Sequence, residues 1–208
     1  MNKGLLVILS GFSGSGKGTI MKRLMEKYDN YVLSVSATTR QPRTGEVDGV
    51  HYFFKTQEEF DQMIKEDAFL EYAGYVNHSY GTPKAYVEEN LNAGRDVILE
   101  IEMQGALQVK RNRPDTLMVF VTPPTAAELE KRLRGRGTET EDVIQQRLQR
   151  AVVEAEYMQL YDYILVNDEV EACVDELHSL IQAQHKQVGN QKEFIEDICR
   201  QLNKREEK

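Results

Sequence analysis

The chain has 208 residues, 40% of them hydrophobic and 29% charged, and a net charge of -8 at pH 7. That length suits one globular domain with small inserted lobes. An acidic chain is a poor general nucleic-acid binder, because the phosphate backbone requires a cationic surface. No apolar run approaches the ~20 residues of a membrane span and no leader precedes the first glycine loop, so we expect a cytoplasmic protein without a membrane partner.

A phosphate-binding loop is predicted between a strand at residues 5–9 and a helix that follows Gly16. The pattern G-x-x-x-x-G-K runs from Gly11 to Gly16 and Lys17, in the strand-to-helix context that distinguishes this motif from a flexible Gly/Ser hairpin. Loop N–H groups and the helix N-terminus would surround phosphates, and Lys17 would reach the β and γ phosphates of a nucleotide. The predicted nucleotide-binding positions, which the resemblance described below assigns to ATP, are Gly11, Phe12, Ser13, Gly14, Ser15, Gly16, Lys17, Gly18 and Thr19.

The hydroxyl that normally follows the lysine of this motif is displaced. Gly18 occupies the expected Ser/Thr position, and Thr19 comes one residue later. Mg²⁺ dehydrates reluctantly, so it can be held mainly by the nucleotide phosphates and water. We therefore expect no dedicated protein cage for the metal, with Thr19 and Glu100 as candidate contacts.

The next strand is predicted at 31–36, and about 60 residues separate it from the following one. They contain the strand-like pieces HYFF and FLEYAGYV and the helical piece TQEEFDQMIKED. This is too long for a crossover, so residues 37–93 are predicted to form an inserted α+β lobe.

Three more buried strands are predicted at 96–101, 117–122 and 163–167, with helices between them. Thr125 is a plausible cap of the helix after Pro124. The charge-dense loop RGRGTETED precedes a long helix from about Glu141, and we interpret residues 134–146 as a mobile lid, a polar connector being the alternative. Alternating strands and helices predict a doubly wound α/β fold with a parallel five-stranded sheet, built from residues 1–36 and 94–185.

Residues 186–208 form a predicted helical tail. Its apolar face would contain Phe194, Ile195, Ile198, Cys199 and Leu202. Two interpretations remain open, packing back on the domain or contacting another subunit. Cys173 and Cys199 both occupy apolar positions without metal-ligand spacing, so both are predicted to be reduced packing residues.

Several motifs, taken together, closely resemble guanylate kinase. They are SATTRQPR at 36–43, GEVDGVHYFF at 45–54, FLEYAGYVNHSYGTP at 69–83, ILEIEMQGALQVK at 98–110, RLRGRGTETED at 132–142 and VND at 166–168. The resemblance covers about residues 4–182. It implies a P-loop NTPase core with a GMP-binding lobe and a lid, and transfer of a phosphoryl group from ATP to GMP with Mg²⁺.

The resemblance also implies a GMP site in the lobe. Arg40, Arg43, Tyr52 and Tyr80 match the family's ligands of the GMP phosphate, and guanidinium forks suit phosphate oxygens. Glu71 matches the acid that accepts from guanine N1–H and the 2-amino group, with the hydroxyls of Ser36 and Thr82 beside it. Glu102 is expected to approach the guanine or its lobe, and Glu100 the water shell of the metal. Guanylate kinases commonly have Asp at one or both of these positions.

The predicted catalytic residues are Lys17, Arg132, Arg136 and Arg147. Phosphoryl transfer requires positioning and charge neutralisation more than a covalent catalyst. Arg136 and Arg147 match the lid arginines of the family most directly, and Arg150 is left out as a solvated neighbour. Asn167 in VND is expected to frame the adenine of ATP.

Two rival functions remain. A guanylate-kinase-like domain that binds proteins without catalysis is disfavoured by the intact Gly16 and Lys17. A kinase for another phosphorylated acceptor is disfavoured by the set Arg40, Arg43, Glu71 and Tyr80. Oligomeric state is left open between a monomer and a homo-oligomer.

Overall fold

The computed structural model describes residues 3–75, 77–135, 137 and 140–206. Its main sheet has five parallel strands in the order β2-β7-β1-β8-β9. The strands are β1 (Leu6–Gly11), β2 (Tyr31–Leu33), β7 (Asp96–Leu99), β8 (Leu117–Thr122) and β9 (Tyr163–Val166). The prediction of five parallel strands in a doubly wound α/β fold is confirmed.

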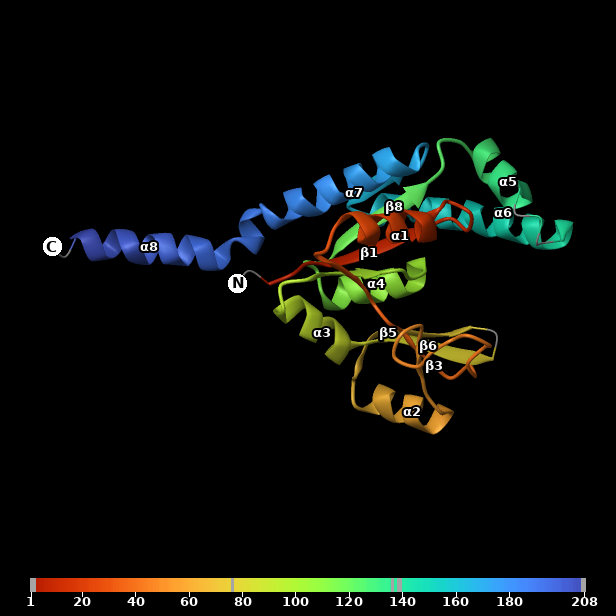
Figure 1. The fold of residues 1–208 in the computed structure, drawn as a ribbon, viewed down its shortest axis with the longest axis horizontal. Coiled ribbons are helices and arrows are strands. Elements are labelled where there is room, and N and C mark those ends of the chain that lie inside the picture. Colours follow the sequence, from red (N-terminus) through yellow and green to blue (C-terminus); the bar gives the residue numbers. More distant parts are fainter. Residues whose placement is uncertain (1–2, 76, 136, 138–139, 207–208) are drawn as a thin grey trace.

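Helices cover both faces of this sheet because its strands are apolar on both sides (Figure 1). Helices α1 (Lys17–Lys27) and α7 (Val170–His185) bury Leu24 and Leu177 against one face. The opposite face is covered by α3 (Lys84–Asn92), α4 (Met103–Asn112), α5 (Ala126–Gly135) and α6 (Glu141–Glu156). On α1, Met21 is buried and Met25 is exposed.

A second, smaller sheet lies beside the main one. Its strand order is β4-β3-β6-β5, formed by β3 (Ala37–Thr38), β4 (Phe53–Phe54), β5 (Phe69–Tyr75) and β6 (His78–Pro83). Helix α2 (Gln57–Lys65) packs on it through Phe60, which belongs to a small separate core with Ala37 and Phe69. A capping box between Thr56 and Glu59 starts this helix.

The inserted lobe therefore has its own apolar core. Helix α3, which falls within the predicted range 37–93, instead places Val87 and Leu91 in the core of the main sheet. The sheet of the lobe ends at Pro83. We use "the lobe" below for residues 37–83.

Helix α5 begins as the sequence predicts, because the Thr125 hydroxyl accepts from the Glu128 N–H at 3.1 Å. The chain ends with the short 3₁₀ turn η2 (Val188–Asn190) and helix α8 (Lys192–Glu206); a second 3₁₀ turn, η1, spans Met158–Leu160. No helix among residues 3–206, as far as they are described, is long and apolar enough to cross a membrane.

Candidate active site

The loop between β1 and α1 is closely packed against the ends of β8 and β9. A Cβ on Gly11 would lie 2.2 Å from the carbonyl oxygen of Val121, and one on Gly16 would lie 2.3 Å from Asn167 Nδ2. Gly16 has a φ of 95°, a conformation that only glycine adopts readily. Both glycines are therefore required by the fold of the loop itself.

Asn167 lies beneath this loop. Its side chain is buried, and Nδ2 donates to the Ser15 carbonyl at 2.7 Å. The predicted contact with adenine stays a prediction. The hydrogen bond also gives Asn167 a structural role, because it holds the phosphate loop against the end of β9.

Lys17 projects from the first turn of α1 toward the mouth of the loop. Its Nζ donates to the carbonyls of Gly11 at 2.7 Å and Phe12 at 3.1 Å. Gly18 is exposed, and a Cβ on it would meet no heavy atom within 4 Å; Thr19 is exposed as well. Glycine at position 18 is thus not required by packing.

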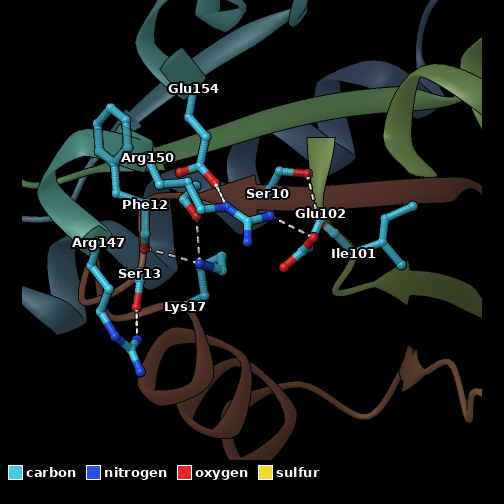
Figure 2. A network of polar contacts seen from close by, with 10 residues as sticks. Ser10, Phe12, Ser13, Lys17, Ile101, Glu102, Arg147, Arg150 and Glu154 are labelled. Carbon is cyan, nitrogen blue, oxygen red and sulfur yellow. Dashed lines mark hydrogen bonds and ion pairs between the residues drawn. The ribbon is translucent and has the colours of Figure 1, made fainter. Parts of the chain in front are cut away.

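A cleft of about 660 Å³ opens in front of Lys17. Figure 2 shows the side chains of Lys17, Glu102, Arg147 and Arg150 gathered around it. Arg147 reaches from α6 to donate to the Ser13 hydroxyl of the loop. This brings one predicted lid arginine to the phosphate loop, as its assigned role requires.

Strand β7 ends at Leu99, two residues before the end of the predicted strand 96–101, so Glu100 lies outside the strand, as Glu102 does. Glu100 directly follows β7, and Glu102 precedes the first residue of α4. Burial raises the pKa of Glu100, and the Lys17 charge partly opposes that rise. Both carboxylates line the cleft.

Arg150 was missed as a member of the site. It donates to Glu102 Oε2 at 2.7 Å and to Glu154 Oε1 at 3.0 Å, within the network of Figure 2. The ion pair joins α6 to the start of α4. Its position one turn after Arg147 on α6 was the available sequence signal.

The structure gives less information on the other two predicted catalytic arginines, Arg132 and Arg136. Arg132 donates to Glu128 on its own helix at 2.9 Å and is partly buried. Arg136 lies outside the described residues, so its predicted role is not placed. Most of the predicted lid, residues 134–146, belongs to the ends of α5 and α6.

The predicted phosphate clamp comes together in the lobe. The Arg40 guanidinium carbon lies 5.3 Å from the centre of the Tyr52 ring, and the rings of Tyr52 and Tyr80 are 6.2 Å apart. Tyr52 also lines the cleft. Arg43 is nearby in sequence and exposed.

Glu46 is a residue that the sequence interpretation overlooked. It accepts from both terminal nitrogens of Arg40, at 2.9 and 2.8 Å, and from the Arg43 backbone N–H at 2.7 Å. The paired guanidinium lowers the pKa of Glu46 to about 2. This carboxylate therefore orients the Arg40 fork and shapes the loop that carries Arg43.

The proposed guanine reader, Glu71, lies on β5 and is 8% exposed. The Thr82 hydroxyl donates to its Oε1 at 2.6 Å. Burial raises the pKa of Glu71, and the Thr82 hydrogen bonds partly oppose this. Ser36 lies just before β3, and its carbonyl accepts from the Phe53 N–H at 2.9 Å.

Gly105 on α4 makes room for this carboxylate. A Cβ on Gly105 would lie 2.7 Å from Glu71 Oε2. The carboxylate of the lobe thus rests against the core at a position where no side chain fits. Sequence reasoning could not identify this contact, because 34 residues separate its two partners.

The donor set suits a metal held by a nucleotide. Thr19 and Glu100 offer oxygens near Lys17. Thr19 is exposed, and Glu100 keeps access to solvent although the walls of the cleft partly desolvate its carboxylate. Among the residues that the structure describes, no group of three or more His, Cys, Asp and Glu could hold a metal ion.

Comparison with known proteins gives consistent results. The family model described as guanylate kinase matches residues 3–184. The chain is 53% identical over 183 residues to a guanylate kinase of Desulfitobacterium hafniense, an alignment that covers 88% of this chain and 92% of that one. It is 51% identical over 199 residues to a guanylate kinase of Oceanobacillus iheyensis, covering 94% of this chain and 97% of that one. The crystal structure of guanylate kinase from Anaplasma phagocytophilum superposes with a TM-score of 0.70 at 30% identity, covering 90% of this chain and 89% of that one.

Proposed function

The chain belongs to the guanylate kinase family and is an ATP:GMP phosphotransferase, and we propose that Lys17 and the arginines of α5 and α6 neutralise the phosphates while Glu71 reads the guanine. The products are ADP and GDP. The alternative of a non-catalytic protein-binding domain is not supported, since relatives of about 50% identity are named guanylate kinase.

The observation that carries the specificity proposal is the buried carboxylate of Glu71, held by Thr82 and seated against Gly105. Guanine presents two donors on one edge, N1–H and the 2-amino group, and a carboxylate accepts from both. Adenine presents an acceptor lone pair at the same place. A buried site built on such hydrogen bonds rejects the wrong base by a factor on the order of 10⁴, because its polar groups would be left unpaired.

The transfer itself follows from the position of the charges. A GMP phosphate oxygen attacks the γ phosphorus in line, the new P–O bond forms, and the bond from that phosphorus to the β–γ bridging oxygen breaks to release ADP. The attacking phosphate is already anionic, so no general base is needed. Lys17 and Arg147, at the mouth of the loop and above Ser13, would stabilise charge on the transferring group, with Arg132 and Arg136 as further predicted donors.

We propose Mg²⁺ as the metal that accompanies ATP. When bound, it would neutralise charge on the β and γ phosphates. Thr19 and Glu100 are the residues of this chain that would contact it or its water shell. The GMP phosphate would bind Arg40, Arg43, Tyr52 and Tyr80, with Arg40 oriented by Glu46. A location in the cytoplasm stays a prediction.

The proposal is tested by offering ATP with GMP, AMP, CMP or UMP in a coupled assay of ADP release. We expect turnover with GMP and a rate lower by on the order of 10⁴ with AMP. Equal turnover of AMP would remove the role of Glu71, and no turnover of GMP would contradict the kinase activity.

A further inference from the structure

Helix α8 leaves the α/β core and projects away from it, at the end of the molecule opposite the lid helices α5 and α6 (Figure 1). Its direction is held by two side-chain hydrogen bonds to the end of α7. Asn190 Nδ2 donates to the Gln184 carbonyl at 2.9 Å, and Gln191 Nε2 donates to the His185 carbonyl at 2.6 Å. The family model ends at residue 184, before α8 begins, so this helix is an addition to the catalytic fold.

The apolar side of α8 does not pack back on the domain, which decides against one of the two sequence interpretations. Phe194 is 62% exposed, Leu202 is 56% exposed, and Ile195 and Ile198 are each 40% exposed. Cys199 is exposed too, contrary to its predicted role as a packing residue, whereas Cys173 is buried as predicted. A single 15-residue helix is marginally stable in water without a partner for its apolar face.

The charges of α8 divide between its two halves. Residues 192–199 contain one lysine and three acids, whereas residues 200–206 contain three basic residues and one acid. A second α8 laid alongside in the same direction would place acidic half against acidic half. Laid in the opposite direction, it would place each acidic half against a basic half and also oppose the two helix dipoles favourably.

We propose that α8 pairs antiparallel with α8 of a second copy of this chain, forming a two-fold symmetric dimer. The face of one helix meets the same face of the other, as a two-fold interface requires. Ile198 and Leu202 of one helix face Leu202 and Ile198 of its partner, and the two Cys199 side chains lie near the symmetry axis. Because α8 projects from the end of the molecule opposite α5 and α6 (Figure 1) and none of its residues lines the cleft, each copy keeps a complete active site.

The first test is the mass of the full chain in solution, measured by light scattering over a range of concentrations. We expect twice the 23.9 kDa of one chain at the higher concentrations. Ile198→Glu should shift the protein to the mass of one chain without changing GMP turnover. Asn203→Glu is the matched control, because it adds the same charge to the same helix at a polar, exposed position outside the apolar stripe. A wild-type chain that stays monomeric, or an Ile198→Glu variant that stays dimeric, would overturn the proposal.

The second test fixes the direction of pairing by thiol crosslinking. A short bis-maleimide should join two chains through Cys199, and Cys199→Ser should abolish the product, because Cys173 is 2% exposed and burial raises its pKa to about 12. Lys192→Cys in the Cys199→Ser background should not crosslink to itself. With Ile198 opposite Leu202 the symmetry axis passes position 200, so antiparallel pairing separates the two copies of position 192 by about 24 Å along the helices, at 1.5 Å per residue. Self-crosslinking of that variant as efficient as through Cys199 would mean parallel pairing and contradict the proposal.

Discussion

Single residues from the lobe and from the core meet at the proposed guanine site, and Glu71 with Gly105 is the clearest case. The carboxylate comes from β5 of the lobe, and the space that admits it comes from α4 of the core. The two are complementary in shape, since Glu71 Oε2 occupies the space that a side chain at position 105 would need. If Glu71 reads the guanine as proposed, selectivity for guanine should depend on a glycine with no polar group of its own.

Gly105→Ala should weaken GMP binding by at least about tenfold, because its Cβ would lie 2.7 Å from Glu71 Oε2 and displace the carboxylate. The helix should tolerate the change, since alanine is a better helix former than glycine by about 1 kcal/mol. KM values for GMP and ATP measure the effect. Gly74→Ala is the control, because a Cβ there meets no atom within 4 Å. An unchanged KM for GMP would mean that the position of Glu71 does not matter.

The raised pKa of Glu71 predicts a pH dependence of GMP affinity. Burial favours the protonated acid, which cannot accept from both guanine donors, so affinity should fall on acidification, beginning above the ordinary glutamate pKa of 4.5. The GMP phosphate also titrates, near pH 6. Glu71→Gln separates the two effects: it should bind GMP at least about tenfold more weakly at pH 7 and retain only the phosphate titration. The same pH profile in wild type and variant would count against Glu71.

The raised pKa of Glu71 also affects the stability of the fold, and here the pH dependence is opposite to that of GMP affinity. The native state binds a proton at Glu71 more readily than the unfolded chain does, so this group's contribution to stability falls as pH rises from the unfolded pKa through the folded one. The charged Glu71 therefore lowers stability at neutral pH, a cost that its proposed role in binding GMP would explain.

Among the elements, those of the core could be predicted from the sequence, and the contacts between distant elements could not. The five strands were recognisable because burial on both faces requires continuous apolar runs such as LLVIL, and the phosphate loop because its spacing is local. The contacts of Gly105 with Glu71 and of Arg150 with Glu102 depend on packing between distant segments, and that of Glu46 with Arg40 on the conformation of an irregular loop. Helix α3 was assigned to the lobe because periodicity does not show which sheet a helix covers.

The phosphate loop offers a prediction from two neighbouring glycines. Gly16→Ala should destabilise the protein by roughly 1–3 kcal/mol through its left-handed φ alone, and should weaken ATP binding by displacing Asn167. Gly18→Ala should be neutral or stabilising by up to about 1 kcal/mol, since it lies in α1 with open space around it. Thermal unfolding with and without ATP measures both. Equal damage from the two substitutions would show that Gly18 has a function that packing does not reveal.

The molecule as a whole has two apolar cores of very different size. The core of the main sheet has residues from its own five strands and six helices, and Leu70 of β5 reaches into it from the lobe; the core of the lobe itself is centred on Ala37, Phe60 and Phe69. Fewer buried contacts mean a lower free energy of local opening. The lobe should therefore open without the main sheet, and GMP should suppress that opening if it binds Arg40 and Glu71 of the lobe as proposed.

Phe60→Ala tests whether the two cores are independent. Phe60 is fully buried and stacks on Phe69 with ring centres 4.5 Å apart, so truncation should cost about 3–5 kcal/mol, confined to the lobe. The variant should lose GMP affinity and protection of lobe amides from hydrogen exchange, yet retain ATP binding and protection of β1 and β8. Val50→Ala, at an exposed lobe position, should change neither. Simultaneous loss of ATP and GMP binding would show that the lobe and the main sheet unfold as one unit. In that case the contact of Glu71 with α4 would couple them more strongly than their separate cores suggest.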